Sequence, residues 1–241
     1  MLALKLILSG IIGYLIGNIQ TSILISLARH DDIRSHGSGN AGSTNMIRVY
    51  GLKYGLLTFF CDFGKAFLAV ALAKWVIPLI PGLGSVVDDN MSVYLAAFMV
   101  AIGHNFPVFF GFKGGKGVAA SFGAVWAVFG MINGDWITPI LTTFFGIGLV
   151  IVTGIVSIGS LAGALTEFVC TLIVNAVKPD TDAGAIMLAF LLFGLLFLRH
   201  TENIVRLLHG EEKKVFKSKK DKEKEAQEAM HTSQDNKKEE N

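Results

Sequence analysis

The sequence predicts an all-α, polytopic membrane protein with about seven transmembrane helices. Nine of the 21 basic and nine of the 19 acidic residues fall in the last 31 positions, so the first 210 residues carry only 22 charges. A soluble domain carries charge on about 25% of its residues, and a soluble surface could not be covered with so few. The mean hydropathy of +0.55 agrees. Several apolar stretches also approach or exceed the roughly 20 residues that a helix needs to cross a bilayer.

The first four apolar stretches each predict one helix. Stretch 2–28 is longer than the apolar core of a signal peptide and has no small-residue cleavage site after it, so we expect a retained span. Stretches 54–78, 93–110 and 118–132 follow. Strands are excluded because the alternation of apolar and polar residues that a membrane barrel needs is absent.

The fifth stretch, 137–177, is about twice the length of one span. Small and polar residues between 153 and 160 interrupt it, which predicts two helices separated there. Stretch 183–198 completes the seven.

The short loops predict an N-terminus outside the cell and a cytoplasmic C-terminus. With seven spans, one side receives segments 29–53, 111–117 and 153–160 and everything after 198. Up to residue 210 that side has eight basic residues, against three on the other side. Because cytoplasmic loops are enriched in Lys and Arg, the first side is expected to face the cytoplasm.

The chain is expected to divide into a transmembrane domain, 1–210, and a charged cytoplasmic tail, 211–241. The tail mixes Lys and Glu with few apolar residues and therefore predicts disorder. The lysines between 213 and 224 could instead lie on anionic lipid.

Composition also argues against some functions. The net charge of +2 is thinly spread and no basic stripe interleaves with aromatic residues, so nucleic-acid binding is not expected. Cys61 and Cys170 lie in apolar stretches and predict core packing, not a disulfide or zinc site. No metal or cofactor is expected.

The first cytoplasmic loop, from His36 to Arg48, has the composition of an anion site. It formally matches Gly-x-Gly-x-x-Gly, but a dinucleotide site needs a preceding strand and a charged run precedes this loop. Exposed amides and a helix start with an Arg one turn later favour a bound phosphate. An ordinary turn beside the lipid headgroups remains the alternative. The candidate side-chain donors are Ser38, Asn40, Ser43, Thr44 and Asn45.

The second loop places Gly114 and Gly115 between Lys113 and Lys116. It is not a Walker A motif, because the glycine spacing is one residue short and Gly117 stands where Ser or Thr would bind magnesium. The glycines would let the backbone approach an anion while two ammonium groups neutralise it. Lysines at a membrane boundary often only anchor a span, but this composition favours ligand binding.

Other polar residues lie in or beside the predicted spans. Asp62 and Lys65 are three residues apart and could pair or line a site. Glu167 has no obvious partner. His200 and Asn203 share a helical face just after the last span, and the two anion-binding loops on the same side favour a role for them in one site.

Together these motifs resemble the bacterial membrane glycerol-3-phosphate acyltransferases that use acyl phosphate as donor, the PlsY family. The matching segments are GSGNAGSTNMIR at 37–48, the Asp62/Lys65 pair, HNFPVFFGFKGGKGVA at 104–119, Ser157 with Ser160, and RHTENIVRLLHGEE at 199–212. They run from the first span to the start of the tail in the family's order. The chain departs from the family near Gly154, where a basic residue is often present.

The resemblance implies a seven-helix, multi-pass enzyme of the bacterial cell membrane with its active site facing the cytoplasm. It would transfer a fatty acyl group from acyl phosphate to the 1-hydroxyl of sn-glycerol 3-phosphate, giving lysophosphatidic acid and phosphate, the first step of phospholipid synthesis. The implied partners are these two substrates, membrane lipid and the enzyme that makes acyl phosphate. The implied catalytic residues are His104, Lys113, Lys116, His200 and Asn203. The implied contacts to substrate or phosphate are Ser38, Asn40, Thr44, Arg48, Gly114, Gly115 and Ser157.

Catalysis is expected to consist largely of positioning and charge stabilisation, because acyl phosphate has a good leaving group. The resemblance implies that a substrate phosphate acts as the base, while His104 or His200 remains an alternative. Grooves lined by Phe106, Phe109, Phe110 and Leu161 are expected to hold the acyl chain.

Two other classes compete with an acyltransferase. A transporter for an organic phosphate would use the same cations, but no internal repeat is visible and the polar motifs lie at one face only. A protein with only a structural role in the membrane would not explain why glycines lie beside clustered hydrogen-bond donors in the two loops.

Overall fold

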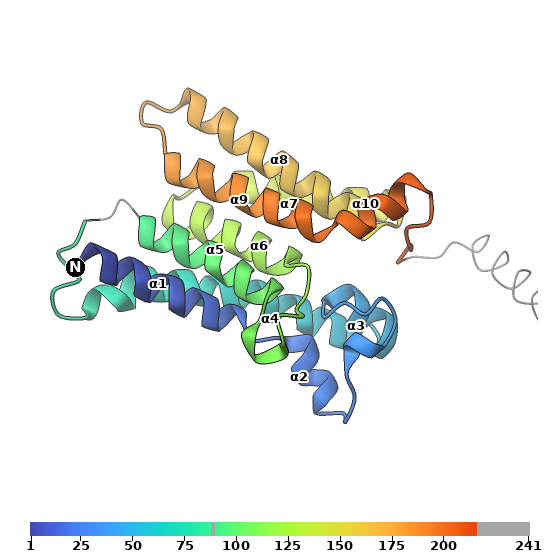
Figure 1. Cartoon of the computed structure of the whole chain (residues 1–241). Coiled ribbons are helices and arrows are strands. Elements are labelled where there is room, and N and C mark those ends of the chain that lie inside the picture. Colours follow the sequence, from blue (N-terminus) through green and yellow to red (C-terminus); the bar gives the residue numbers. More distant parts are fainter. Residues whose placement is uncertain (88–89, 216–241) are drawn as a thin grey trace, which may run out of the picture.

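The computed structural model describes residues 1–87 and 90–215, and this part of the chain is helical without any strand. The all-α prediction is therefore confirmed for these residues. The helices form one bundle in which the longer ones lie side by side, with the short α2 and α3 at one end (Figure 1). The structure has ten α-helices within the described residues. They are α1 (Leu2–Gly17), α2 (Thr21–Leu27), α3 (Ser43–Tyr50), α4 (Leu52–Ala71), α5 (Met91–Asn105), α6 (Val118–Val125), α7 (Ile137–Thr153), α8 (Val156–Val177), α9 (Ala183–Arg199) and α10 (Thr201–Leu208).

Hydropathy and length identify three helical segments that could cross a membrane within the described residues: Leu52–Leu79, Met91–Phe110 and Val156–Val177. The bent pairs α1–α2 and α9–α10 would bring the number to five. Two further apolar segments, Val118–Ile132 and Ile137–Thr153, are shorter. Large apolar side chains such as Leu141 and Phe144, which do not line a cavity, are each 63% exposed, as expected where a membrane protein meets lipid.

The first predicted span is broken, which the sequence analysis did not foresee. α1 and α2 meet at an angle of 41°. A helix break at this depth must satisfy its freed backbone groups within the protein. Gln20 Nε2 donates to the carbonyls of Gly17, at 3.1 Å, and His104, at 3.0 Å. Lys65 Nζ donates to the carbonyl of Ile19 at 2.7 Å. The break is thus stabilised by α4 and α5.

The predicted division of 137–177 is present, and it lies at Gly154, whose φ of +75° ends α7. α8 begins at Val156, so Ser157 and Ser160 are helical and do not belong to a loop. Gly146 and Gly159 let the two helices cross closely. A Cβ on Gly159 would lie 2.3 Å from the Gly146 carbonyl oxygen.

Small residues also bring α1 against α5. A Cβ on Gly17 would lie 2.3 Å from the Val100 carbonyl oxygen, and one on Gly103 would lie 2.2 Å from that of Tyr14. This close packing sets His104, the residue after Gly103, beside the α1–α2 break.

The polar segments gather at one end of the bundle. α3 and α10 lie at that end, on the right of Figure 1, while the N-terminus lies at the other. Arg34 Nη1 donates to the Phe110 carbonyl at 2.9 Å and so joins the first polar loop to the second.

Candidate active site

One large cavity, of about 1430 Å³, lies at the polar end of the bundle. Four stretches far apart in the sequence form its polar wall: part of 32–48, part of 104–119, part of 150–160 and part of 198–213. We call it the large cavity.

The large cavity brings together eleven of the twelve residues that the sequence analysis proposed. They are Ser38, Asn40, Thr44, Arg48, His104, Lys113, Gly114, Lys116, Ser157, His200 and Asn203. The twelfth, Gly115, lies behind this wall, against the imidazole of His104.

The first loop is held in shape by Asn45. This side chain is 1% exposed. Its Oδ1 accepts from the Ser38 amide at 2.9 Å, and its Nδ2 donates to the carbonyls of His36, at 2.9 Å, and Ile33, at 3.2 Å. Asn45 is therefore occupied with the loop's own backbone, which leaves Ser38, Asn40 and Thr44 at the cavity wall.

The second loop folds tightly over His104. A Cβ on Gly114 would lie 2.0 Å from the His104 carbonyl oxygen, and one on Gly115 would lie 2.2 Å from its Nε2. In this structure the two glycines thus make room for His104. Lys113 is exposed, whereas Lys116 is half-buried and donates a hydrogen bond to Asn203 Oδ1. Burial lowers the pKa of Lys116, and the nearby Arg206 adds to this.

The third element is the bend between α9 and α10, which measures 60°. His200 lies at the bend, and Asn203 is the third residue of α10. Their side chains are 3% and 8% exposed. Arg199 Nη2 donates to the Gly115 carbonyl at 3.1 Å, and its guanidinium lies 5.1 Å from the centre of the Phe106 ring. Arg199 therefore ties α9 to the second loop.

The two acidic residues within the spans, Asp62 and Glu167, both have partners. Asp62 lines the large cavity and pairs with Lys65 at 3.0 Å. Glu167 Oε2 accepts a hydrogen bond from Thr142 between α7 and α8.

Glu212 also lines the large cavity, although it was not among the twelve predicted residues: it ends the matching segment 199–212 and lies at the start of the predicted tail. Its carboxylate accepts from Ser157 Oγ at 3.0 Å, from Arg206 Nε at 2.8 Å and from Asn203 Nδ2. Burial alone would raise the pKa of Glu212, but these hydrogen bonds outweigh it and hold the pKa below its ordinary value. An ionised carboxylate thus lies among the expected phosphate contacts.

The apolar part of the large cavity lies between α4, α6 and α7. It includes Phe59 and Phe63, Phe122, and Ile147 and Val150. The predicted acyl-groove residues Phe106, Phe109, Phe110 and Leu161 do not line the large cavity, so their part in holding an acyl chain stays a prediction. Phe109, for example, is 70% exposed, and Phe106 lies beneath Arg199.

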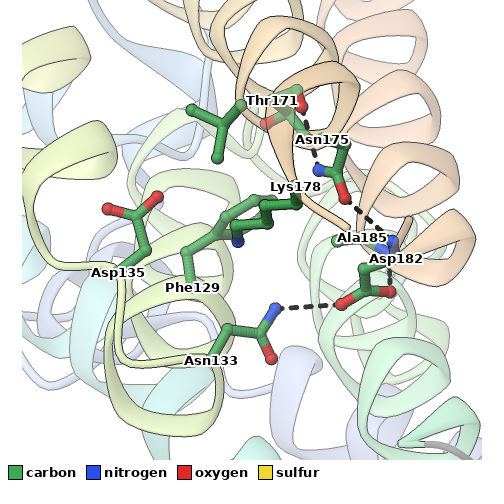
Figure 2. Close-up of a pocket in the computed structure, with 9 residues that line it drawn as sticks. Phe129, Asn133, Asp135, Thr171, Asn175, Lys178, Asp182 and Ala185 are labelled. Atoms are coloured by element: carbon green, nitrogen blue, oxygen red, sulfur yellow. Dashed lines mark hydrogen bonds between the residues drawn. The ribbon is translucent and has the colours of Figure 1, made fainter. Parts of the chain in front are cut away.

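A second cavity lies at the opposite end of the bundle (Figure 2). Its volume of about 10 Å³ suffices for about one water molecule. Its polar groups mostly join helices: Asp182 accepts from the Ala185 amide at 2.9 Å and from Asn133 at 3.2 Å, and its amide donates to Asn175 at 2.8 Å. In residues 1–87 and 90–215 no group of three or more His, Cys, Asp or Glu side chains is placed to hold a metal ion.

Comparisons with known proteins agree with this geometry. The glycerol-3-phosphate acyltransferase family model matches residues 7–210. A glycerol-3-phosphate acyltransferase of Finegoldia magna is 37% identical over 217 residues, which are 89% of this chain and 98% of that protein. The corresponding protein of Thermosipho melanesiensis is 39% identical, over 88% of this chain and 93% of its own length.

Solved structures show the same fold. The crystal structure of PlsY, an integral membrane glycerol 3-phosphate acyltransferase, in its glycerol 3-phosphate form aligns with a TM-score of 0.73 and 31% identity. The alignment covers 87% of this chain and 94% of that one. The lysophosphatidic acid form gives a TM-score of 0.72. The chain is a membrane protein that belongs to the glycerol-3-phosphate acyltransferase family, the PlsY family.

Proposed function

We propose that this protein transfers a fatty acyl group from acyl phosphate to the 1-hydroxyl of sn-glycerol 3-phosphate, giving lysophosphatidic acid and inorganic phosphate. One observation carries the proposal: cationic and hydrogen-bonding groups from four segments share a single cavity with an apolar wall between helices. Such a cavity suits one water-soluble phosphate ester and one phosphate with a hydrocarbon chain.

In the proposed reaction the 1-hydroxyl oxygen attacks the acyl carbon. The bond from that carbon to the phosphate oxygen breaks, and the hydroxyl proton goes to a phosphate oxygen. Because acyl phosphate is a mixed anhydride, catalysis then rests on alignment and on stabilisation of the oxyanion and the leaving phosphate.

The residues divide between these tasks by position. The two phosphates would be held by cationic and hydrogen-bonding side chains: Arg48, Lys113, Lys116, Asn203, Ser38, Asn40, Thr44 and Ser157. Gly114 and Gly115 shape the loop around His104. The acyl chain would lie along Phe59, Phe63 and Phe122.

We further propose that seven spans place this site at the cytoplasmic face of a bacterial cell membrane. They are the pair α1–α2, α4, α5, Val118–Ile132, α7, α8 and the pair α9–α10. Residues 1–210 would form the catalytic domain, and 211–241 a cytoplasmic tail whose course beyond Val215 lies outside the described residues. Labelling of single cysteines at His36 and Lys116 in intact cells tests the orientation. Both should be protected from an impermeant reagent.

A direct assay tests the reaction. Purified protein given palmitoyl phosphate and glycerol 3-phosphate should form lysophosphatidic acid without added CoA or metal. Turnover with palmitoyl-CoA and none with palmitoyl phosphate would contradict the proposed donor. Co-purification would test contact with the enzyme that makes acyl phosphate.

A further inference from the structure

Lys65 lies in α4 behind the wall of the large cavity, with its side chain 5% exposed. Its Nζ has four polar neighbours for three hydrogens, and the Gly17 carbonyl is the most distant of the four. These are Asp62 Oδ1 at 3.0 Å, His104 Nδ1 at 2.8 Å, and the carbonyl oxygens of Ile19 at 2.7 Å and Gly17 at 3.2 Å.

This arrangement determines which nitrogen of His104 carries the proton. An ammonium group has three hydrogens and no lone pair, so it can only donate. The Asp62 carboxylate supplies the charge partner that a buried ammonium requires at this depth. His104 Nδ1 must therefore accept from Lys65, and the imidazole proton resides on Nε2.

The protonated Nε2 lies on the side of His104 that faces the glycine-rich second loop, at the wall of the large cavity. His104 is 3% exposed but contributes to the wall of the large cavity. Its Nε2 lies against Gly115, directly before Lys116. Among the described residues, the side-chain contacts of His104 involve Nδ1 and leave Nε2 without a hydrogen-bond partner.

We propose that Lys65 is a positioning residue for acyl transfer, which fixes His104 as an Nε2–H donor aimed into the cavity. The inference rests on the proposed function and adds to it: His104 stabilises negative charge on the acyl phosphate and does not take the hydroxyl proton. His200 has the opposite arrangement, since its Nδ1 donates to the Leu196 carbonyl at 2.8 Å and its Nε2 is left as an acceptor. The two histidines therefore have different roles.

Two substitutions of His104 separate a donor from a base. A Gln side chain places an amide N–H near the position of Nε2 but cannot take up a proton, whereas Ala provides neither function. We expect H104Q to retain at least about tenfold more kcat than H104A, whose loss should reach about 10². Equal losses in the two variants would overturn the donor role.

Lys65→Met keeps the length of the side chain and removes its hydrogens. It should lower kcat about as much as H104A does while changing KM for glycerol 3-phosphate little, because Arg48 and Lys116 are untouched. The double variant with H104A should lose no more than either single variant, as expected if Lys65 acts through His104. Losses that multiply would overturn the proposal and assign Lys65 to the α1–α2 break alone. Lys5→Met is the matched control, since this buried lysine donates to the Val86 carbonyl at the other end of the bundle.

A spectroscopic measurement does not depend on turnover. Imidazole ¹⁵N NMR of the detergent-purified full chain, with the His104 signal identified by its loss in H104Q, should show Nε2 protonated and Nδ1 unprotonated. A proton on Nδ1 would overturn the inference even if the enzyme is active. The expected tautomer in a protein that makes no lysophosphatidic acid would instead contradict the proposed function. If Lys65→Met fails to fold, this spectrum and the two His104 variants still decide the question.

Discussion

Lys116 donates a hydrogen bond to Asn203 Oδ1, although 87 residues separate the two in the sequence. One lies at the end of the glycine-rich loop and the other in α10. The contact brings the second and fourth polar segments of the sequence into one site. It also orients the Asn203 amide, whose Nδ2 donates to Glu212.

Lys116→Ala should lower kcat/KM by about 10² to 10³, because it removes a preorganised cation from the phosphate site. Arg48→Ala should have a comparable effect. Both variants should still insert and purify as monodisperse protein. Lys74→Ala, which removes a lysine bonded to Asn90 at the far end of the bundle, is the control and should retain activity. Full turnover in both site variants would contradict the roles assigned to these cations.

Binding of glycerol 3-phosphate should weaken at alkaline pH, because the Lys116 ammonium loses its proton there. Burial lowers the pKa of Lys116, so its ammonium is lost at a lower pH than that of an exposed lysine. Glycerol 3-phosphate is already fully ionised there, since its second pKa is about 6. KM for glycerol 3-phosphate should therefore rise as pH increases, measured from about 7 to 10. Lys116→Arg should abolish this rise because a guanidinium stays charged. An identical pH profile in that variant would exclude Lys116 as its cause.

Gly115→Ala should abolish most activity while α4, α5 and α6 still pack. Its Cβ would lie 2.2 Å from His104 Nε2 and 2.9 Å from the Ala41 carbonyl oxygen, so the imidazole must move. Gly148→Ala is the matched control, because a Cβ at that helical position meets nothing within 4 Å. Activity and melting temperature should be measured for both. A normal rate in Gly115→Ala would show that the position of His104 is unimportant.

Hydropathy located the helices to within a few residues because the thickness of the bilayer sets their length. The division of the long stretch 137–177 followed from a local signal, Gly154, which now ends α7 with a positive φ. The break between α1 and α2 could not be predicted in this way. It depends on Lys65 and on the carbonyl of His104, which only the tertiary packing brings to Gln20.

For the site too, features with a local sequence signal could be predicted, whereas features that depend on tertiary packing could not. The polar residues that share the large cavity could be picked out from the sequence, because they lie in glycine-rich or charged motifs whose composition is unusual for a membrane protein. The apolar wall of the large cavity could not be predicted, because an apolar side chain such as Phe109 carries no sign in the sequence of whether it faces a cavity or the outside. Asn45 also belongs to the first motif, but its side-chain amide forms hydrogen bonds with the backbone of its own loop and is not available to a ligand.

Glu212 is expected to compete with the substrate phosphate. Ser157 has one hydroxyl hydrogen, and it is donated to the Glu212 carboxylate at 3.0 Å. If Ser157 also holds a phosphate during turnover, Glu212 must first leave. Two more contacts attach the segment around it. Arg48 Nη2 donates to the Lys213 carbonyl at 3.3 Å, and the Val215 amide donates to the Gly154 carbonyl at 2.8 Å.

Glu212→Ala should therefore lower KM for glycerol 3-phosphate by about tenfold, or ~1.4 kcal/mol of binding, and should do so without a matching gain in kcat. Glu211→Ala removes a neighbouring carboxylate that is exposed, and it should leave KM unchanged. Glu212→Gln keeps the shape but removes the charge, so it should fall between the two. The opposite sign, a higher KM in Glu212→Ala, would mean that the carboxylate serves to hold Asn203 and Arg206 in place for the substrate. Initial rates over a range of glycerol 3-phosphate concentrations, at saturating palmitoyl phosphate, distinguish these outcomes because only displacement predicts tighter binding when the carboxylate is gone.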